Sequence, residues 1–200
     1  MRLWHTLSVE IVQPCVFEGK GSALPRLAIM TTLQTIVTHL AMDAPLAVAG
    51  GDIAWPEGVS FEREQSMALN DYRALYDMVG RKWHWVNRRH LDDRQLAALI
   101  HHPATEIYVL RRNGAAIGYI ELNFKLFPQV EIVFLGLIED EIGNGLGPLV
   151  MKSCMQIIKA RDPKRVIIQT CTLDHPSALR LYQKTGFAPV RRKQVEIIDT

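Results

Sequence analysis

The stretch QVEIVFLGLIEDEIGNGLGPLV, residues 129–150, determines the fold that we expect for this chain. It begins with Gln129–Leu137, whose β-branched and apolar side chains predict a strand. Three glycines follow within residues 142–147, and a helical pattern then continues to about Ala160. A second apolar run, Val166–Cys171, predicts another buried strand. A strand, a helix and a strand in this order form a crossover, which joins two parallel strands of one sheet.

The sequence upstream predicts antiparallel partners for these strands. Glu106–Arg112 and Ala116–Asn123 flank Asn113-Gly114, the strongest short hairpin signal, and a turn at Phe127-Pro128 leads into the next strand. The other expected elements are strands over 35–42, 59–64 and 189–198, and helices over 70–80, from 92 to before Pro103, and up to Gly186. We therefore expect an α/β (α+β) fold. Its mixed, twisted central sheet has an antiparallel meander and one parallel β-α-β crossover, with helices on both faces.

The length of 200 residues corresponds to one domain, or to one domain with an extension. We expect residues 59–200 to form the domain and residues 1–58 an N-terminal extension that contributes one strand. Met30 offers an alternative start, so that residues 1–29 add little to the fold. An ordinary N-terminal arm is the other interpretation, and the role of residues 1–29 stays open.

Composition and charge exclude several classes of function. The chain is 48% hydrophobic and 22% charged, and its net charge of +2 is too small to indicate a nucleic-acid partner. No apolar run is long enough for a transmembrane helix, so we expect no membrane partner. The cysteines Cys15, Cys154 and Cys171 stand among apolar neighbours without metal-ligand spacing, which predicts buried thiols, a cytoplasmic protein and no metal site.

The glycine-rich loop is the first candidate for binding. Gly143, Gly145 and Gly147 allow the backbone to turn its N–H groups toward a ligand, and a helix expected to begin at Pro148 adds the positive end of its dipole. A phosphate-bearing ligand fits this arrangement. The loop lacks the Gly-Lys-Ser/Thr of a Walker loop, and its glycines have the wrong spacing for a dinucleotide fold.

At this point the sequence resembles the GNAT superfamily of acyl-CoA N-acyltransferases. The superfamily's phosphate loop, Gln/Arg-x-x-Gly-x-Gly/Ala, is matched at Gly145 and Gly147. Its second motif, Ala-x-x-Leu-Tyr-x-x-x-Gly-Phe, is matched by the residues Ala178, Leu181, Tyr182, Gly186 and Phe187. The resemblance covers roughly residues 59–190. Ile142 departs from it, because it stands where Gln or Arg is usual, and the acids at 139–141 would repel phosphate unless they point away.

The resemblance implies that acetyl-CoA donates an acetyl group to an amine, through a tetrahedral intermediate that expels the thiolate. Main-chain groups of Leu135 and Leu137 are then expected to pair with the pantetheine arm like an extra strand, and the loop is expected to hold the pyrophosphate. The cofactor-binding residues implied in this way are Leu135, Gly136, Leu137, Ile142, Gly143, Asn144, Gly145, Leu146, Gly147, His175 and Ala178.

Two residues carry the chemistry in this interpretation. Tyr182 is the general acid, since its intrinsic pKa of about 10 is in the range of an alkyl thiol. Glu131, on an otherwise apolar strand, resembles the base of the histone-acetyltransferase branch, and apolar surroundings would raise its pKa. Glu121 on the neighbouring strand and His175 are alternative bases. Packing for Tyr182, solvent exposure for Glu131 and helix capping for His175 are the simpler interpretations.

The acceptor is the least determined part of the prediction. Trp83 and Trp85, interleaved with cations, could frame an amine beside Glu121, or could simply anchor the two helices that they connect. The acceptor class therefore stays open between a small-molecule amine and a protein amine. A homodimer through the strand at 35–42 is a further possibility. The rival function is a non-catalytic acyl-CoA-binding sensor or docking module.

Overall fold

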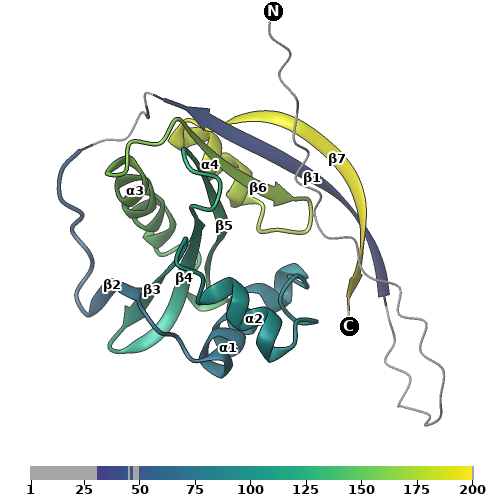
Figure 1. Cartoon of the computed structure of the whole chain (residues 1–200). Coiled ribbons are helices and arrows are strands. Elements are labelled where there is room, and N and C mark those ends of the chain that lie inside the picture. The colour runs from purple at the N-terminus through teal and green to yellow at the C-terminus, as the bar shows by residue number, and fades with distance from the viewer. Residues whose placement is uncertain (1–30, 45, 47–49, 200) are drawn as a thin grey trace, which may run out of the picture.

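The computed structural model describes residues 31–44, 46 and 50–199, which form one mixed sheet with helices on both faces (Figure 1). The strand order is β2-β3-β4-β5-β6-β1-β7, and only β5 and β6 are parallel. The elements in chain order are β1 (Thr31–Asp43), β2 (Val59–Glu64), α1 (Leu69–Gly80), the 3-10 turn η1 (Arg81–Trp83), α2 (Asp93–Ile100), β3 (Thr105–Arg112), β4 (Ala115–Asn123), β5 (Gln129–Leu137), η2 (Glu139–Glu141), α3 (Leu146–Lys159), β6 (Arg165–Cys171), α4 (Ser177–Thr185) and β7 (Ala188–Asp199).

The expected mixed fold with one parallel crossover is confirmed. The hairpin between β3 and β4 turns at Asn113 and Gly114, whose φ values of 50° and 83° are both positive, as a tight two-residue turn requires. Helix α2 begins with a capping box, in which the Asp92 carboxylate accepts the Gln95 N–H at 2.7 Å and the Gln95 side chain accepts the Asp92 N–H at 3.0 Å.

The start of α3 differs from the prediction. The helix begins at Leu146 and not at Pro148, because Gly145 adopts a left-handed conformation (φ 78°) and ends the loop there. Pro148 is consequently the third helical residue. Its missing N–H is one of those that a first helical turn leaves without an internal partner, so the proline costs no hydrogen bond.

Strand β1 occupies the position between β6 and β7. It pairs antiparallel with β6 over Val37–Asp43 and with β7 along almost its whole length, and the two long strands curve together past the body of the sheet (Figure 1). The strand expected at 35–42 therefore lies inside the sheet. Predictions for residues 1–29, including Cys15, lie outside the described residues.

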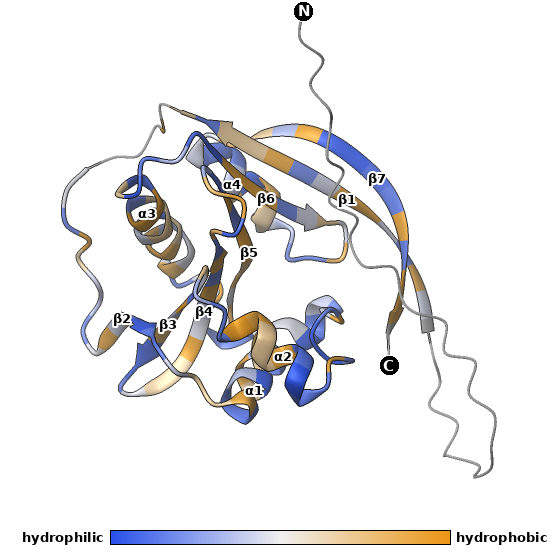
Figure 2. Cartoon of the chain, in the orientation of Figure 1, coloured by the Kyte–Doolittle hydropathy of each residue, from blue (hydrophilic) through white to orange (hydrophobic). Residues whose placement is uncertain are grey.

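The sheet carries two apolar cores, one on each face. Helices α1 and α2 cover one core, which contains Tyr72, Tyr76, Leu96 and Tyr119. Helices α3 and α4 cover the other, where Val150, Met151, Cys154, Met155 and Ile158 pack on Ile132, Val166 and Ile168. Figure 2 shows the corresponding distribution, with apolar residues along β5 and on α3 and polar ones along β7. No helix in the described ranges has both the length and the apolar character to span a membrane.

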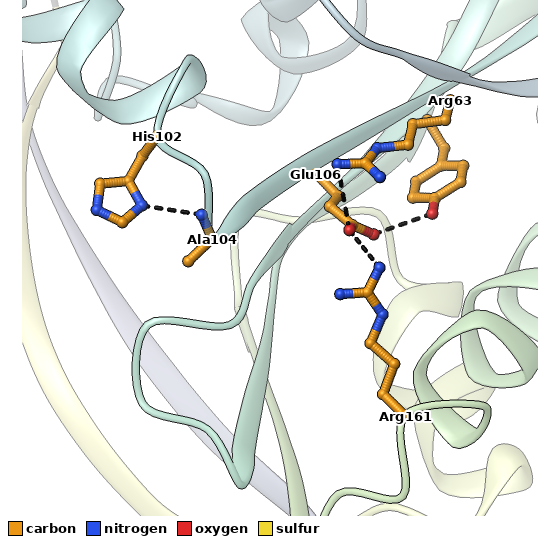
Figure 3. A network of polar contacts seen from close by, with 6 residues as sticks. Arg63, His102, Ala104, Glu106 and Arg161 are labelled. Atoms are coloured by element: carbon orange, nitrogen blue, oxygen red, sulfur yellow. Dashed lines mark hydrogen bonds and ion pairs between the residues drawn. The ribbon is translucent and has the colours of Figure 1, made fainter.

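Glu106 of β3 forms contacts with β2 and with the segment that follows α3 (Figure 3). Its carboxylate is 3% exposed and pairs with Arg63 of β2 at 3.2 Å and with Arg161, which follows α3. The Tyr108 hydroxyl donates to the second carboxylate oxygen at 3.0 Å. A buried charge needs such partners, because it has lost its hydration. Glu106 is therefore a structural residue.

Replacing Glu106 with Gln is expected to lower the free energy of unfolding by about 1–2 kcal/mol, because the hydrogen bonds to charged partners weaken while both arginines keep access to water. Glu62, the exposed glutamate of β2, provides the control, and Glu62→Gln is expected to change stability by less than about 0.5 kcal/mol. Urea unfolding followed by circular dichroism measures both. Equal effects of the two substitutions would contradict the structural role of Glu106.

Candidate functional site

A cleft forms where β5 and β6 separate. Their parallel pairing ends at Ile132 and Ile168, and the register of β5 against β4 shifts between Ile132 and Phe134, so that Val133 is a bulge residue. A bulge bends its strand and interrupts the ladder. Beyond it lies a cavity of about 200 Å³, lined by the ends of β5 and β6, the start of β1, the segment 83–87 and α4. The cleft thus lies at the carboxyl ends of the parallel pair, where α/β sheets bind ligands.

The end of β5 turns an unpaired backbone edge toward this cleft. The Ile138 N–H donates to the Ile117 carbonyl at 2.9 Å, and antiparallel pairing directs every second residue of β5 toward β4. Leu135 and Leu137 are the alternate residues, so their N–H and C=O groups point away from β4. Among the described strands none pairs with them there. Gly136 has a packing role, since a Cβ at this position would lie 2.4 Å from Val79.

The glycine-rich loop follows directly and is open. Gly143 and Gly145 have φ values of 92° and 78°, and a Cβ built on either would meet no described atom within 4 Å. The N–H groups of Gly145, Leu146 and Gly147 precede the first internal hydrogen bond of α3 and are available to an anion. The Asn144 side chain instead donates within the loop, to the Asp140 carbonyl at 3.1 Å. The arrangement fits a diphosphate held by main-chain N–H groups.

Two of the three acids before the loop are neutralised by cations. Glu141 forms two hydrogen bonds with Arg112 of β3, at 2.7 and 2.9 Å, and this interaction lowers the pKa of its carboxyl. Glu139 pairs with Lys82 of η1. These contacts fix the loop to the body of the domain and reduce the repulsion of an anion that the sequence suggested.

Tyr182 of α4 is one of the residues that line the cleft. Its side chain is 6% exposed and packs on Phe187, and its hydroxyl has no hydrogen-bond partner among the described residues. Burial, followed by the charge of Asp174, raises the pKa of Tyr182. The hydroxyl therefore keeps its proton at physiological pH and can donate a hydrogen bond.

The two glutamates that sequence reasoning offered as bases differ in their surroundings. Glu121 is 2% exposed, and both carboxylate oxygens are used, one by Arg88 at 2.7 Å and one by the Tyr72 hydroxyl at 2.5 Å. Glu131 is only partly buried, on the same face of the sheet, and has no ion pair among the described residues. Burial raises the pKa of Glu131, and the charge of Glu121 adds to the effect while Arg88 opposes it. Glu131 therefore has the accessibility and proton affinity of a base.

The two tryptophans differ as well. Trp85 packs among Tyr76, Tyr119 and Phe134, and a Cβ on Gly80 would collide with its ring at 2.5 Å, so its main contacts are with the core. Trp83 is half-buried at the cleft and makes an edge contact with the His175 ring, with centroids 5.2 Å apart. The Nδ1 atom of His175 accepts the Ser177 N–H at 3.1 Å, which is a capping contact.

Most predicted site residues meet at the cleft. Those that line it are Trp83, Trp85, Leu135, Gly136, Leu137, Ile142, His175, Ala178 and Tyr182. Glu121, Glu131 and the residues 143–147 do not line the cavity itself. Across the described ranges there is no group of His, Cys, Asp and Glu that could hold a metal ion.

Sequence reasoning missed Asp174, which also lines the cleft. Its carboxylate accepts hydrogen bonds from the Thr170 hydroxyl at 2.7 Å, the Cys171 N–H at 2.8 Å and the Trp85 indole at 3.2 Å. Asp174 thereby joins the two walls of the cleft. The available signal was an acidic residue just after a buried strand, a position that commonly supports a turn.

The sequence from α1 to just after α4 matches a known protein family. The model of the acetyltransferase (GNAT) family matches residues 72–187, more than half of the chain. The chain belongs to the GNAT family of acetyltransferases. The resemblance expected from the loop and the Tyr182 motif is thus confirmed. The match includes β5, the glycine-rich loop and α4, whereas Thr35 and Val37 of β1 and Ile197 of β7, which also line the cleft of this GNAT domain, lie outside it.

Solved structures agree with this assignment at the level of the fold. A GCN5-related N-acetyltransferase from Sphaerobacter thermophilus aligns with a TM-score of 0.60 at 15% identity, over 84% of this chain and 51% of that one. A tandem GNAT protein from the clavulanic acid biosynthesis pathway aligns at 0.59 and 18%, over 82% and 54%. An aminoglycoside acetyltransferase from an uncultured soil metagenomic sample aligns at 0.54 and 17%, over 69% and 92%.

These identities establish the GNAT fold but do not identify a substrate. The chain spans about half the length of the first and second of these proteins. No curated protein sequence matches the chain.

Proposed function

We propose that this protein transfers an acetyl group from acetyl-CoA to a primary amine. The observation that carries the proposal is a pair of features close together in the chain: the unpaired main-chain groups of Leu135 and Leu137 at the cleft, which Tyr182 also lines, and the open N-terminus of α3 that follows the glycine-rich loop. When bound, acetyl-CoA supplies a thioester whose carbonyl carbon an amine can attack. Leu135 and Leu137 would bind the pantetheine arm, and the N–H groups of 145–147 would bind the diphosphate.

The chain's own residues then handle the protons. As the amine nitrogen forms the new amide bond and the carbon–sulfur bond breaks, the nitrogen must lose a proton and the thiolate must be stabilised. Glu131 accepts the proton, because its carboxylate is accessible and its pKa is raised by burial. Tyr182 donates a hydrogen bond to the sulfur. The leaving thiolate takes up a proton from water and Glu131 releases its own, so that the products are an amide and free coenzyme A.

Binding of coenzyme A tests the loop. Gly145→Ala is expected to weaken the affinity for coenzyme A at least about tenfold, because the left-handed backbone at this residue positions the N–H groups and a Cβ would enter the space of the diphosphate. The strain of an alanine at positive φ should also lower the free energy of unfolding by about 1–2 kcal/mol. Calorimetric titration and urea unfolding measure the two effects.

Gly114 provides a matched control, since it has a φ of 83° and equally open surroundings but lies in the β3–β4 hairpin. Gly114→Ala should cause comparable strain and leave the affinity for coenzyme A unchanged. Equal affinities of both variants would contradict the loop's role. Release of free thiol with a broad panel of amines tests the chemistry: a protein that binds coenzyme A but never releases thiol would be an acyl-CoA sensor and not an enzyme.

A further inference from the structure

One face of the sheet is left open beside the cleft. Helices α1 and α2 pack on β3, β4 and β5, whereas α3 and α4 cover the opposite face (Figure 1). Gln169 is exposed although its strand, β6, lies between two others, which shows that none of the described elements covers this part of β6 on the side of α1 and α2. The diphosphate loop belongs to the α3 side. An acceptor therefore has this open face as its route to the thioester.

Strand β7 places two cations on the open face. Side chains of directly paired residues lie on the same face, and Arg191 pairs with His39 while Lys193 pairs with Val37. Because His39 pairs with Gln169, all of these side chains share its open face. Val37 lines the cleft, and the Cβ of Lys193 lies about 5 Å from that of Val37. Lys193 therefore lies beside the cleft, and Arg191 lies on the same face of β7, two residues farther from it.

These cations have no acidic partner. Arg191 and Lys193 are exposed and form no ion pair among the described residues. The pKa of His39 is lowered by burial and then by the charges of Arg191 and Lys193, which shows that both charges act on the same patch. The acid of β1 on this face, Asp43, is already paired with Arg165 at 2.9 Å.

The opposite wall of the cleft adds no unpaired charge to this patch from its arginines and lysines. Residues 81–90 contain four of them and no acid, but Arg81 and Arg89 pair with Asp77, Lys82 pairs with Glu139, and Arg88 pairs with Glu121. Of the described residues that line the cavity, Asp174 is the single carboxylate, and three donors already occupy it. An amine that reaches the thioester by the open face therefore meets the charges of Lys193 and Arg191, which have no acidic partner among the described residues. A negative charge elsewhere on the acceptor would lower the free energy of this approach, and a second positive charge would raise it.

We propose that the acceptor carries an anionic group, a carboxylate or a phosphate, and that Lys193 and Arg191 bind this group while the amine enters the cleft. The inference rests on the proposed acetyl transfer and names the substrate class of the same site. Cations on β7, an edge strand, could instead serve only to prevent strand pairing between molecules. Arg192 separates the two roles, because it pairs with Thr38 and points to the other face of the same edge.

Three amines with one carbon skeleton test the proposal: aminohexanoate, hexylamine and diaminohexane, whose far ends are anionic, neutral and cationic. We expect kcat/KM for the wild-type protein to fall in that order, with at least about tenfold between the first and the last. Arg191→Glu combined with Lys193→Glu should reverse the order. Arg192→Glu should keep it. Binding of adipate and of diaminohexane to the protein saturated with coenzyme A, followed by calorimetry, gives a second readout that needs no turnover.

The outcomes separate this proposal from the proposed function. If no amine releases thiol but adipate binds, and binds at least about tenfold more weakly to the double variant, the transferase activity fails and the anion site stands. If amines react but the wild-type protein prefers diaminohexane, or if the double variant keeps the wild-type order, the anion site is refuted and the activity stands. Equal effects of Arg192→Glu and the double variant would assign the cations to edge protection and also refute the proposal.

Discussion

Glu131→Gln is expected to lower kcat/KM for acetyl transfer on the order of a hundred- to ten-thousandfold, the usual contribution of a general base. Gln has the size of Glu and can still accept a hydrogen bond, but it cannot take the proton that the attacking amine must lose. The affinity for coenzyme A should stay unchanged, because Glu131 is on the face of the sheet opposite the phosphate loop. Release of thiol and calorimetric titration measure the two quantities.

The pH dependence distinguishes a base from a residue that only supports the fold. Burial and Glu121 raise the pKa of Glu131, so the rate should rise with pH above the ordinary carboxyl range as Glu131 loses its proton. The rate of the Glu131→Gln variant should not show this rise with pH. For stability the sign is opposite to that of a paired carboxylate: a raised pKa in the folded state means that ionised Glu131 opposes folding at neutral pH. Glu131→Gln should therefore not lower the melting temperature.

Glu121→Gln is the matched control on the neighbouring strand. It removes the charge partner of buried Arg88, whose side chain is 14% exposed, and leaves an uncompensated cation. We expect the free energy of unfolding to fall by about 3 kcal/mol. The activity of the protein that remains folded should fall much less than in Glu131→Gln. A large rate loss for Glu121→Gln with intact stability would instead make Glu121 the base.

Local signals explain why so much of the fold could be predicted. Strand β5 and the hairpin at Asn113-Gly114 follow from periodicity and from turn chemistry within a few residues. The crossover then fixes the parallel pair, because it has one favoured geometry. The glycine-rich loop is equally local, because its glycines and its position between strand and helix are contained in six residues, and the surroundings of Gly143 and Gly145 are open.

Contacts between distant parts of the chain explain what could not be predicted. The sequence around Arg88 suggests a solvated charge, but its guanidinium donates to Glu121, which is 33 residues away in the chain. The Trp85 indole likewise donates to Asp174, which is 89 residues away. The difference between Glu121 and Glu131 is of the same kind. Both lie on one face of neighbouring strands, and only the position of Arg88 shows that one is paired and the other accessible. No pattern along either strand carries this information.

The position of β1 was also beyond local reasoning, and it leads to the second large effect. A chain shortened to begin at residue 45 is expected to lose its cooperative unfolding transition. Strand β1 buries Leu40 and Met42 in the core under α3 and α4, and truncating each such side chain alone costs about 2–5 kcal/mol. Among the described strands β7 pairs only with β1, so the shortened chain also loses every ladder contact of β7. A whole domain is stable by about 5–15 kcal/mol, and the combined losses are of this size.

A chain that begins at Met30 is the control, because it lacks a similar part of the N-terminus but retains all of β1. It should unfold in one transition near the midpoint of the full chain, measured by circular dichroism during heating. Hydrogen exchange should then show protection along β6 and β7 in this chain and none in the chain from residue 45. If the shorter chain melts cooperatively at the midpoint of the control, residues 59–200 form the domain alone and β1 is an addition to its edge. If it does not, the GNAT sheet of this protein is complete only when the N-terminal segment supplies the strand between β6 and β7.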